Sequence, residues 1–211
     1  MTDLGFTQTE SDHALFYYEG VADSAISDMH VHCFISWHID NGMGISNSRA
    51  FLEKVKMKIV EQFGIKNLGP VMKYLGVQLE YDQKTCQLWI HLWEYIVFLL
   101  QEYGLLNCNP VYLPADPKAP LGDPTADYPE IPNLCPSYLK LVGELIYLSI
   151  NTHPNIAYVI NSLAQHNTIP KARYFTMATQ VLCYLARTQS LQLHYKGEIA
   201  NKELYAYTDA S

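Results

Sequence analysis

A proline-rich segment between residues 110 and 136 places the strongest limit on how this chain folds. Eight of the eleven prolines in the 211-residue sequence lie there. Each proline removes a backbone N–H donor and disfavours both the interior of a helix and the middle of a sheet. The sequence therefore predicts an extended connector over 110–136 that separates two packed units, one before it and one after it.

The block before the connector contains a clear hairpin pattern. Residues 31–39 alternate, and the apolar side chains that share one face are Val31, Cys33, Ile35, Trp37 and Ile39. A period of two predicts a strand, and the Asp-Asn-Gly that follows favours a tight turn. We therefore expect a strand–turn–strand hairpin with Asp40 and Asn41 at its tip.

The rest of the chain mixes helical and strand-like patterns. Helical spacing covers about 48–63, 92–104, 137–150, 155–166 and 171–187. Strand-like runs are "VMKYLGVQLEYDQKTCQLWIH", read as two strands around a polar turn, and the short runs "LQLHY" and "ELYAYTDAS". Helices and strands in this arrangement indicate the α+β class.

Composition narrows the class of protein. The 14 basic residues against 21 acidic ones give a net charge of −7, which argues against a dedicated nucleic-acid binder. The five cysteines are scattered without a CxxC pair, as expected of free thiols in a reducing compartment. The start shows no signal-peptide pattern, and no apolar run reaches membrane-spanning length. We expect a soluble intracellular protein that has no membrane partner.

Seven stretches of the chain stand in a characteristic order. They are "LGFTQTESDHALF", "HIDNG", "FGIKNLGPVMKYLGVQLE", "YGLLNCNPVYLP", "LVGELIYLSINTHPNIAYVINSLAQ", "VLCYLART" and "YAYTDAS". In this order they resemble the later part of the reverse transcriptase of copia-type LTR retrotransposons. "HIDNG" falls where that family has Tyr-x-Asp-Asp, "THPNI" where it has "TRPDI", and "VLCYLART" where it has "RVLRYLKGT".

The resemblance implies a function and a layout. The ancestral reaction is RNA-directed DNA polymerisation on an RNA or DNA primer-template, with Mg²⁺ as cofactor and dNTPs as substrates. The implied parts are the palm end with a thumb-like region (1–109), the Pro-rich linker (110–136), a helical connection region (137–190) and a truncated start of an RNase H-like domain (191–211). Other polyprotein segments encoded by the same element are the implied partners.

The implied site residues are incomplete. Asp40 matches the first palm aspartate and is the candidate metal ligand, Asn41 stands in place of the second, and Asp209 matches the first RNase H acid. Magnesium needs hard, charged oxygen ligands, and asparagine contributes no negative charge. With at most one of three palm carboxylates left, Asp40 is interpreted as vestigial and the chain is expected to be inactive on its own.

Other interpretations remain open. Taken alone, Asp40-Asn41 is an ordinary turn, because Asx-Gly sequences favour turns by their backbone. The chain is alternatively a retained nucleic-acid- or protein-binding fragment, or one part of an active polyprotein completed by an upstream segment. A third alternative is that the chain is encoded by a decayed element and has no molecular role. The lysines at 54, 56 and 58 are interpreted as a solvated helix face, so no nucleic-acid-binding residue is assigned.

Overall fold

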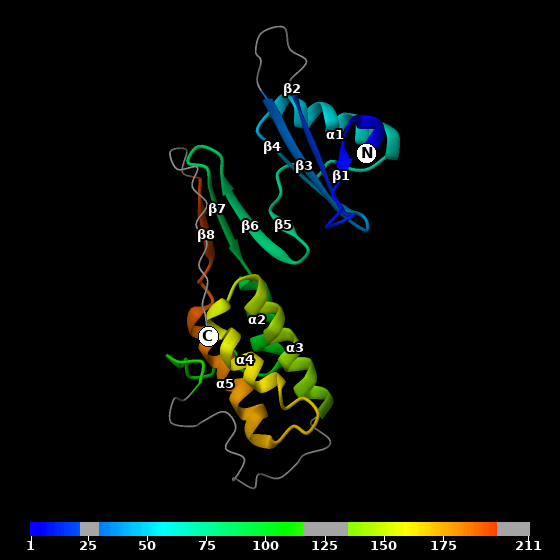
Figure 1. The fold of residues 1–211 in the computed structure, drawn as a ribbon. Coiled ribbons are helices and arrows are strands. Elements are labelled where there is room, and N and C mark those ends of the chain that lie inside the picture. The colour runs from blue at the N-terminus through cyan, green and yellow to red at the C-terminus, as the bar shows by residue number, and fades with distance from the viewer. Residues whose placement is uncertain (22–29, 116–134, 198–211) are drawn as a thin grey trace, which may run out of the picture. The chain divides into compact units, whose positions relative to one another are not determined.

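The structure is a computed structural model that describes residues 1–21, 30–115 and 135–197. Its backbone contacts divide the chain into two compact units, Met1–Tyr74 and Leu75–Ser211. Both units contain helices and strands (Figure 1). The two units are described separately below.

The first unit is an antiparallel sheet with one helix. Its elements are η1 (Thr2–Leu4), β1 (Thr7–Gln8), β2 (Leu15–Val21), β3 (His30–His38), β4 (Asn41–Ser46), α1 (Arg49–Phe63) and the short β5 (Lys73–Tyr74). The sheet order is β1-β2-β3-β4, so each strand pairs with the next one in the chain. A meander of this kind needs only tight connections between neighbouring strands.

One face of β3 supplies the core of the first unit. Cys33 and Ile35 are buried together with Val55 and Ile59 of α1 and with Phe6. These spacings, two residues along a strand and four along a helix, are those of a strand face and a helix stripe. The predicted strand at 31–39 is confirmed up to His38, where β3 ends.

Helix α1 begins and ends where the sequence predicts. The Ser48 side chain accepts a hydrogen bond from the backbone N–H of Phe51 at 3.4 Å, which caps the first turn. Gly64 follows the helix with φ 65°, and its N–H donates to the carbonyl of Val60. Local capping chemistry therefore sets both ends of this helix.

The second unit combines a sheet with four α-helices among its described residues. Its elements are β6 (Val77–Asp82), β7 (Gln87–His91), α2 (Trp93–Glu102), α3 (Cys135–Asn151), η3 (Pro154–Ile156), α4 (Ala157–Ala164), α5 (Ala172–Thr188) and β8 (Leu193–Lys196). Strand β7 pairs with β6 on one side and with β8 on the other, both antiparallel. The chain thus returns, after the helices, to the sheet from which it left (Figure 1).

A single apolar core runs through the helices of the second unit. Ile96 and Leu99 of α2 are buried in the same cluster as Leu145 of α3, Ile160 of α4 and Leu182 of α5. Helix α2 precedes the proline-rich segment and the other three helices follow it. The helices before and after the proline-rich segment therefore pack into one core.

The unit boundary differs from the predicted one. The sequence places it at 110–136, whereas the division lies between Tyr74 and Leu75. Proline prevents regular structure locally, but it leaves the helices on either side free to bury their apolar faces against each other. Within the predicted connector, residues 110–115 hold no helix or strand, and 116–134 lie outside the described residues.

The α+β class is confirmed at the level of mixed helices and antiparallel sheets. The predicted helices at 48–63, 92–104, 137–150, 155–166 and 171–187 all have counterparts, and "LQLHY" contains β8. The predicted strand in "ELYAYTDAS" falls outside the described residues. In the part of the chain that is described, no helix is long and apolar enough to cross a membrane.

Candidate active-site hairpin

The β3–β4 hairpin carries the candidate palm residues. Its register runs from Cys33 opposite Ser46 to His38 opposite Asn41. Ile39 and Asp40 therefore form a two-residue turn, and Asn41 is the first residue of β4. The predicted strand–turn–strand hairpin is confirmed, with Asp40 in the turn and Asn41 directly after it.

The turn lies one residue earlier than predicted. The prediction places Asp40 and Asn41 at the tip and Ile39 on the buried face of the strand. Instead Ile39 is 93% exposed and has φ 55°, in the left-handed region. A positive φ at the first position of a two-residue turn is normally reserved for glycine, and a β-branched residue there is strained.

Gly42 accounts for this shifted register. It pairs with Trp37, and a Cβ atom at position 42 would lie 2.5 Å from the Trp37 ring. The indole occupies the space where a side chain at position 42 would lie, so a glycine is needed at this place in the strand. Because Gly42 is held in the ladder opposite Trp37, the turn falls one residue earlier, on Ile39 and Asp40.

At the tip, the two candidate residues contact each other. The Asn41 side-chain N–H donates to one carboxylate oxygen of Asp40 at 3.0 Å, and both residues are exposed. The amide takes up one acceptor site on the carboxylate and adds no negative charge. Asp40 is thus a single carboxylate with a neutral donor beside it.

This donor set does not fit a pair of magnesium ions. Such ions are bound through several carboxylate oxygens in addition to substrate phosphates. Among the residues that the structure describes, no three His, Cys, Asp or Glu side chains gather in a metal-binding arrangement. Asp209, the candidate RNase H acid, lies outside the described residues.

The sheet face opposite α1 is open in the first unit. Tyr17, Phe34 and Ile45 form a cross-strand row there, and all three side chains are exposed. Farther along β3 the Ser36 hydroxyl lies 3.3 Å from the phenol oxygen of Tyr74. The hairpin therefore buries one face against α1 and presents an apolar row on the other.

The "THPNI" stretch turns out to be structural. His153 is 1% exposed, and burial lowers the pKa of its imidazole. Its Nε2 lies 3.5 Å from the carbonyl of Thr188 and its Nδ1 lies 2.8 Å from the Thr152 hydroxyl. With Nε2 as donor, Nδ1 accepts from Thr152, which satisfies a neutral ring.

Asn155 has a partner of a similar kind. Its side-chain N–H donates to the phenol oxygen of Tyr184 at 2.6 Å, which joins η3 to α5. His153 and Asn155 stand where the pattern "TRPDI" has arginine and aspartate, and both make neutral hydrogen bonds in this structure.

A second polar cluster joins α2 to α3 and was not predicted. The Tyr103 phenol donates to Glu144 at 2.8 Å, and Lys140 contacts both Glu102 and Glu144. Burial, together with the Glu144 carboxylate, raises the pKa of Tyr103. The sequence offers no sign of this cluster because its members lie on helices that flank the proline-rich segment.

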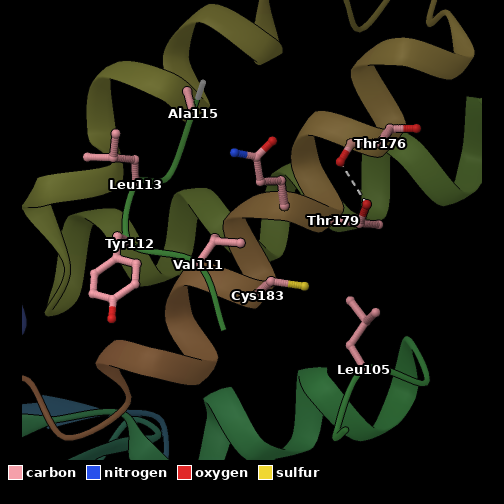
Figure 2. A pocket seen from close by; sticks show the side chains of 9 residues that line it. Leu105, Val111, Tyr112, Leu113, Ala115, Thr176, Thr179 and Cys183 are labelled. Atoms are coloured by element: carbon pink, nitrogen blue, oxygen red, sulfur yellow. Dashed lines mark hydrogen bonds between the residues drawn. The ribbon is translucent and has the colours of Figure 1, made fainter. Parts of the chain in front are cut away.

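A hollow of about 620 Å³ lies between residues 105–115 and α5 (Figure 2). Leu105, Val111 and Leu113 line it from one side, and Thr176 and Thr179 line it from α5. Among its lining residues, all of them in described segments, there is no Asp, Glu, His, Lys or Arg, and the titratable side chains are Tyr112 and Cys183. The hollow therefore has no carboxylate or imidazole that could serve as a general base or a magnesium ligand.

Comparison with known proteins decides the family. A family model of the reverse transcriptase (RNA-dependent DNA polymerase) matches residues 1–117. This chain belongs to that reverse transcriptase family. No solved structure gives a significant match to the chain.

Two relatives of this reverse transcriptase chain are named as transposon proteins. It is 26% identical over 99% of its length to a putative transposon Ty5-1 protein of Saccharomyces cerevisiae. It is 25% identical over 82% of its length to the retrovirus-related Pol polyprotein from transposon TNT 1-94 of Nicotiana tabacum. An uncharacterised mitochondrial protein of Arabidopsis thaliana is 27% identical over 79% of the chain.

These matches confirm the copia-type resemblance found in the sequence. They also show how much of each relative the chain represents. It spans 63% of the yeast protein, 67% of the Arabidopsis protein and 13% of the tobacco polyprotein. The activity of a whole polyprotein is therefore a proposal for this chain.

Proposed function

We propose that this chain is a truncated copia-type reverse transcriptase that does not polymerise DNA on its own. The observation that carries the proposal is the hairpin tip, where Asp40 is paired with the neutral amide of Asn41 at 3.0 Å. The fold around the tip is intact, since β3 and α1 share a buried core and β4 pairs with β3. The proposal thus separates a preserved scaffold from an incomplete site.

The chemistry of nucleotidyl transfer explains why the tip is insufficient. Two divalent ions activate the attacking hydroxyl and stabilise the charge that develops on the phosphates. Their affinity depends on several carboxylates that offset the charge of two dications. Asp40 supplies one negative charge, and Asn41 supplies none.

The parts of the proposed fragment follow the compact units. We assign β1–β4 and α1 to the end of the palm, and α2–α5 to the thumb-like and connection regions. Strand β8 pairs with β7, which supports placing the start of the RNase H-like part after Lys196 rather than at 191. Asp209 is its first acid in this assignment.

A primer-extension assay tests the proposal. Purified chain is given an RNA or DNA primer-template, dNTPs and Mg²⁺, and the expected result is no extension above a no-protein control. Asn41→Asp is expected to leave the result unchanged, because the upstream aspartate and the template-gripping residues are still missing. Metal-dependent extension that Asp40→Ala abolishes would refute it.

A second candidate is that another polyprotein segment completes the enzyme. The tobacco relative is a retrovirus-related Pol polyprotein, and this chain spans 13% of its length. The open row of Tyr17, Phe34 and Ile45 is an apolar surface of the kind that a missing palm segment would cover. The net charge of −7 gives no comparable support to a free nucleic-acid-binding role.

Mixing distinguishes the two candidates. An upstream palm segment from a copia-type polyprotein, carrying the first aspartate, is added to wild-type chain and to Asn41→Asp. Extension by either mixture, and by neither component alone, would favour the completed enzyme. A stable complex without extension by either mixture would favour the fragment that has lost its catalytic set.

A further inference from the structure

Two cysteines from distant parts of the second unit meet through their thiols. Cys108 follows α2, and Cys183 lies in α5 on the far side of the proline-rich segment. Leu105 and Val111, on either side of Cys108, line the same hollow as Cys183, the thiols of Cys108 and Cys183 interact with each other, and both cysteines are free and half-buried. "VLCYLART" has Cys183 where the pattern of the resembled family has arginine.

The backbone around the pair is held by contacts that do not involve sulfur. The N–H of Val111 donates to the carbonyl of Cys183 at 3.4 Å. The guanidinium carbon of Arg187 lies 3.7 Å from the centre of the Tyr112 ring, which is a cation–π contact. Figure 2 shows Val111 and Tyr112 beside Cys183 of α5. Residues 105–115 are thus positioned against α5 independently of the thiols.

Two other cysteines have different surroundings. Cys33 is buried in the core of the first unit, and burial raises the pKa of its thiol. Cys86 lies in the turn before β7, where its thiol donates to the carbonyl of Gln83 at 3.8 Å. Neither offers a neighbouring thiol in the described structure, so Cys86, as the more exposed of the two, provides a matched control.

We propose that Cys108 and Cys183 form a redox-sensitive pair that a peroxide converts into a disulfide. One thiolate attacks hydrogen peroxide, breaks the O–O bond and becomes a sulfenic acid, and the first water leaves. The second thiol attacks that sulfur, forms the S–S bond and releases the second water. The two sulfurs lose two electrons in total, which the peroxide accepts.

Burial and the adjacent Cys108 thiol raise the pKa of Cys183 to about 11. The thiolate is the reactive form, so the oxidation is expected to become faster as the pH is raised above neutral.

The disulfide would link the two sides of the hollow shown in Figure 2. Leu105 and Val111, which flank Cys108 in sequence, line one side, and Cys183 lines the other. A cross-link also restricts the unfolded chain, so the oxidised form is expected to be more stable than the reduced form. A thiol reductant reverses the reaction by exchange.

The test uses the full chain in its unmodified form. Reduced protein is treated with hydrogen peroxide in slight excess, free thiols are alkylated, and disulfide-linked peptides are mapped by mass spectrometry. The expected result is a linked peptide pair containing Cys108 and Cys183, loss of two free thiols per chain and full recovery with dithiothreitol. A dominant pairing of other cysteines, a dominant intermolecular disulfide, or no disulfide in a chain with native circular dichroism would overturn the proposal.

Variants add a second readout. In the wild type and in Cys86→Ser, oxidation is expected to raise the melting temperature by several degrees. In Cys108→Ser and Cys183→Ser that rise is expected to disappear, while the reduced proteins melt close to reduced wild type. A rise that persists in either variant would contradict the assignment. If a serine variant does not fold, the peptide mapping on the unmodified chain still decides the question.

Discussion

Replacing Ile39 by glycine should stabilise the first unit, although it removes a large apolar side chain. Ile39 is the first residue of the hairpin turn, with φ 55°, and its side chain is 93% exposed. A side chain this exposed contributes little burial energy, so the substitution changes mainly the backbone. The sign of the effect then depends on two opposing conformational terms.

The first term favours glycine in the folded state. Holding a residue with a Cβ in the left-handed region costs about 1–2 kcal/mol, and β-branching does not reduce that cost. The second term opposes glycine, which loses about 0.5–1 kcal/mol more backbone entropy on folding. The difference predicts a gain of roughly 0.5–1 kcal/mol in the free energy of unfolding for Ile39→Gly.

Urea unfolding followed by Trp37 fluorescence and circular dichroism measures this gain. Ile39→Ala is the matched control, because it removes the same side chain but keeps a Cβ and therefore keeps the strain. We expect Ile39→Gly to raise the urea midpoint and Ile39→Ala to leave it nearly unchanged. An equal change in both variants, or a lower midpoint for glycine, would show that the turn is not strained as described.

The remaining predictions concern the two cores and a buried histidine. Leu145 is fully buried in the helical core, and Leu145→Ala should lower the free energy of unfolding, measured by urea titration, by about 2–5 kcal/mol. Ile150 is 77% exposed, and Ile150→Ala should change the free energy of unfolding little. Gly42→Val should displace the Trp37 indole and alter its emission spectrum, because a Cβ at 42 meets the ring at 2.5 Å; an unchanged spectrum would contradict the packing. The pKa of His153 is lowered by burial, so below about pH 6.5 the unfolded chain binds the proton first and stability falls as pH falls. Comparing urea midpoints at neutral and mildly acidic pH should show a smaller loss in His153→Gln than in the wild type; equal losses would contradict it.

Much of this fold is written in local sequence patterns. The alternation over 31–37 identifies β3, Ser48 and Gly64 identify the ends of α1, and periodic leucines identify the helices around Leu145 and Leu182. These features depend on residues within one or two turns of each other, where period and capping act directly. The family, and the candidate role of Asp40 and Asn41, were also accessible from motif order.

Tertiary structure decided what depends on residues far apart in the chain. Proline density at 110–136 stops helices and strands, but it carries no information on whether α2 packs against α5, so the boundary at Tyr74 was missed. The contact of Gly42 with Trp37 moves the turn onto Ile39, a choice that the favourable Asn-Gly sequence conceals. The meeting of Cys108 and Cys183, like the pairing of β8 with β7, arises because burial of the helical core brings distant segments together. Local propensity sets elements within a few residues, whereas burial of apolar surface sets their partners, and that second choice is made only when the chain is folded.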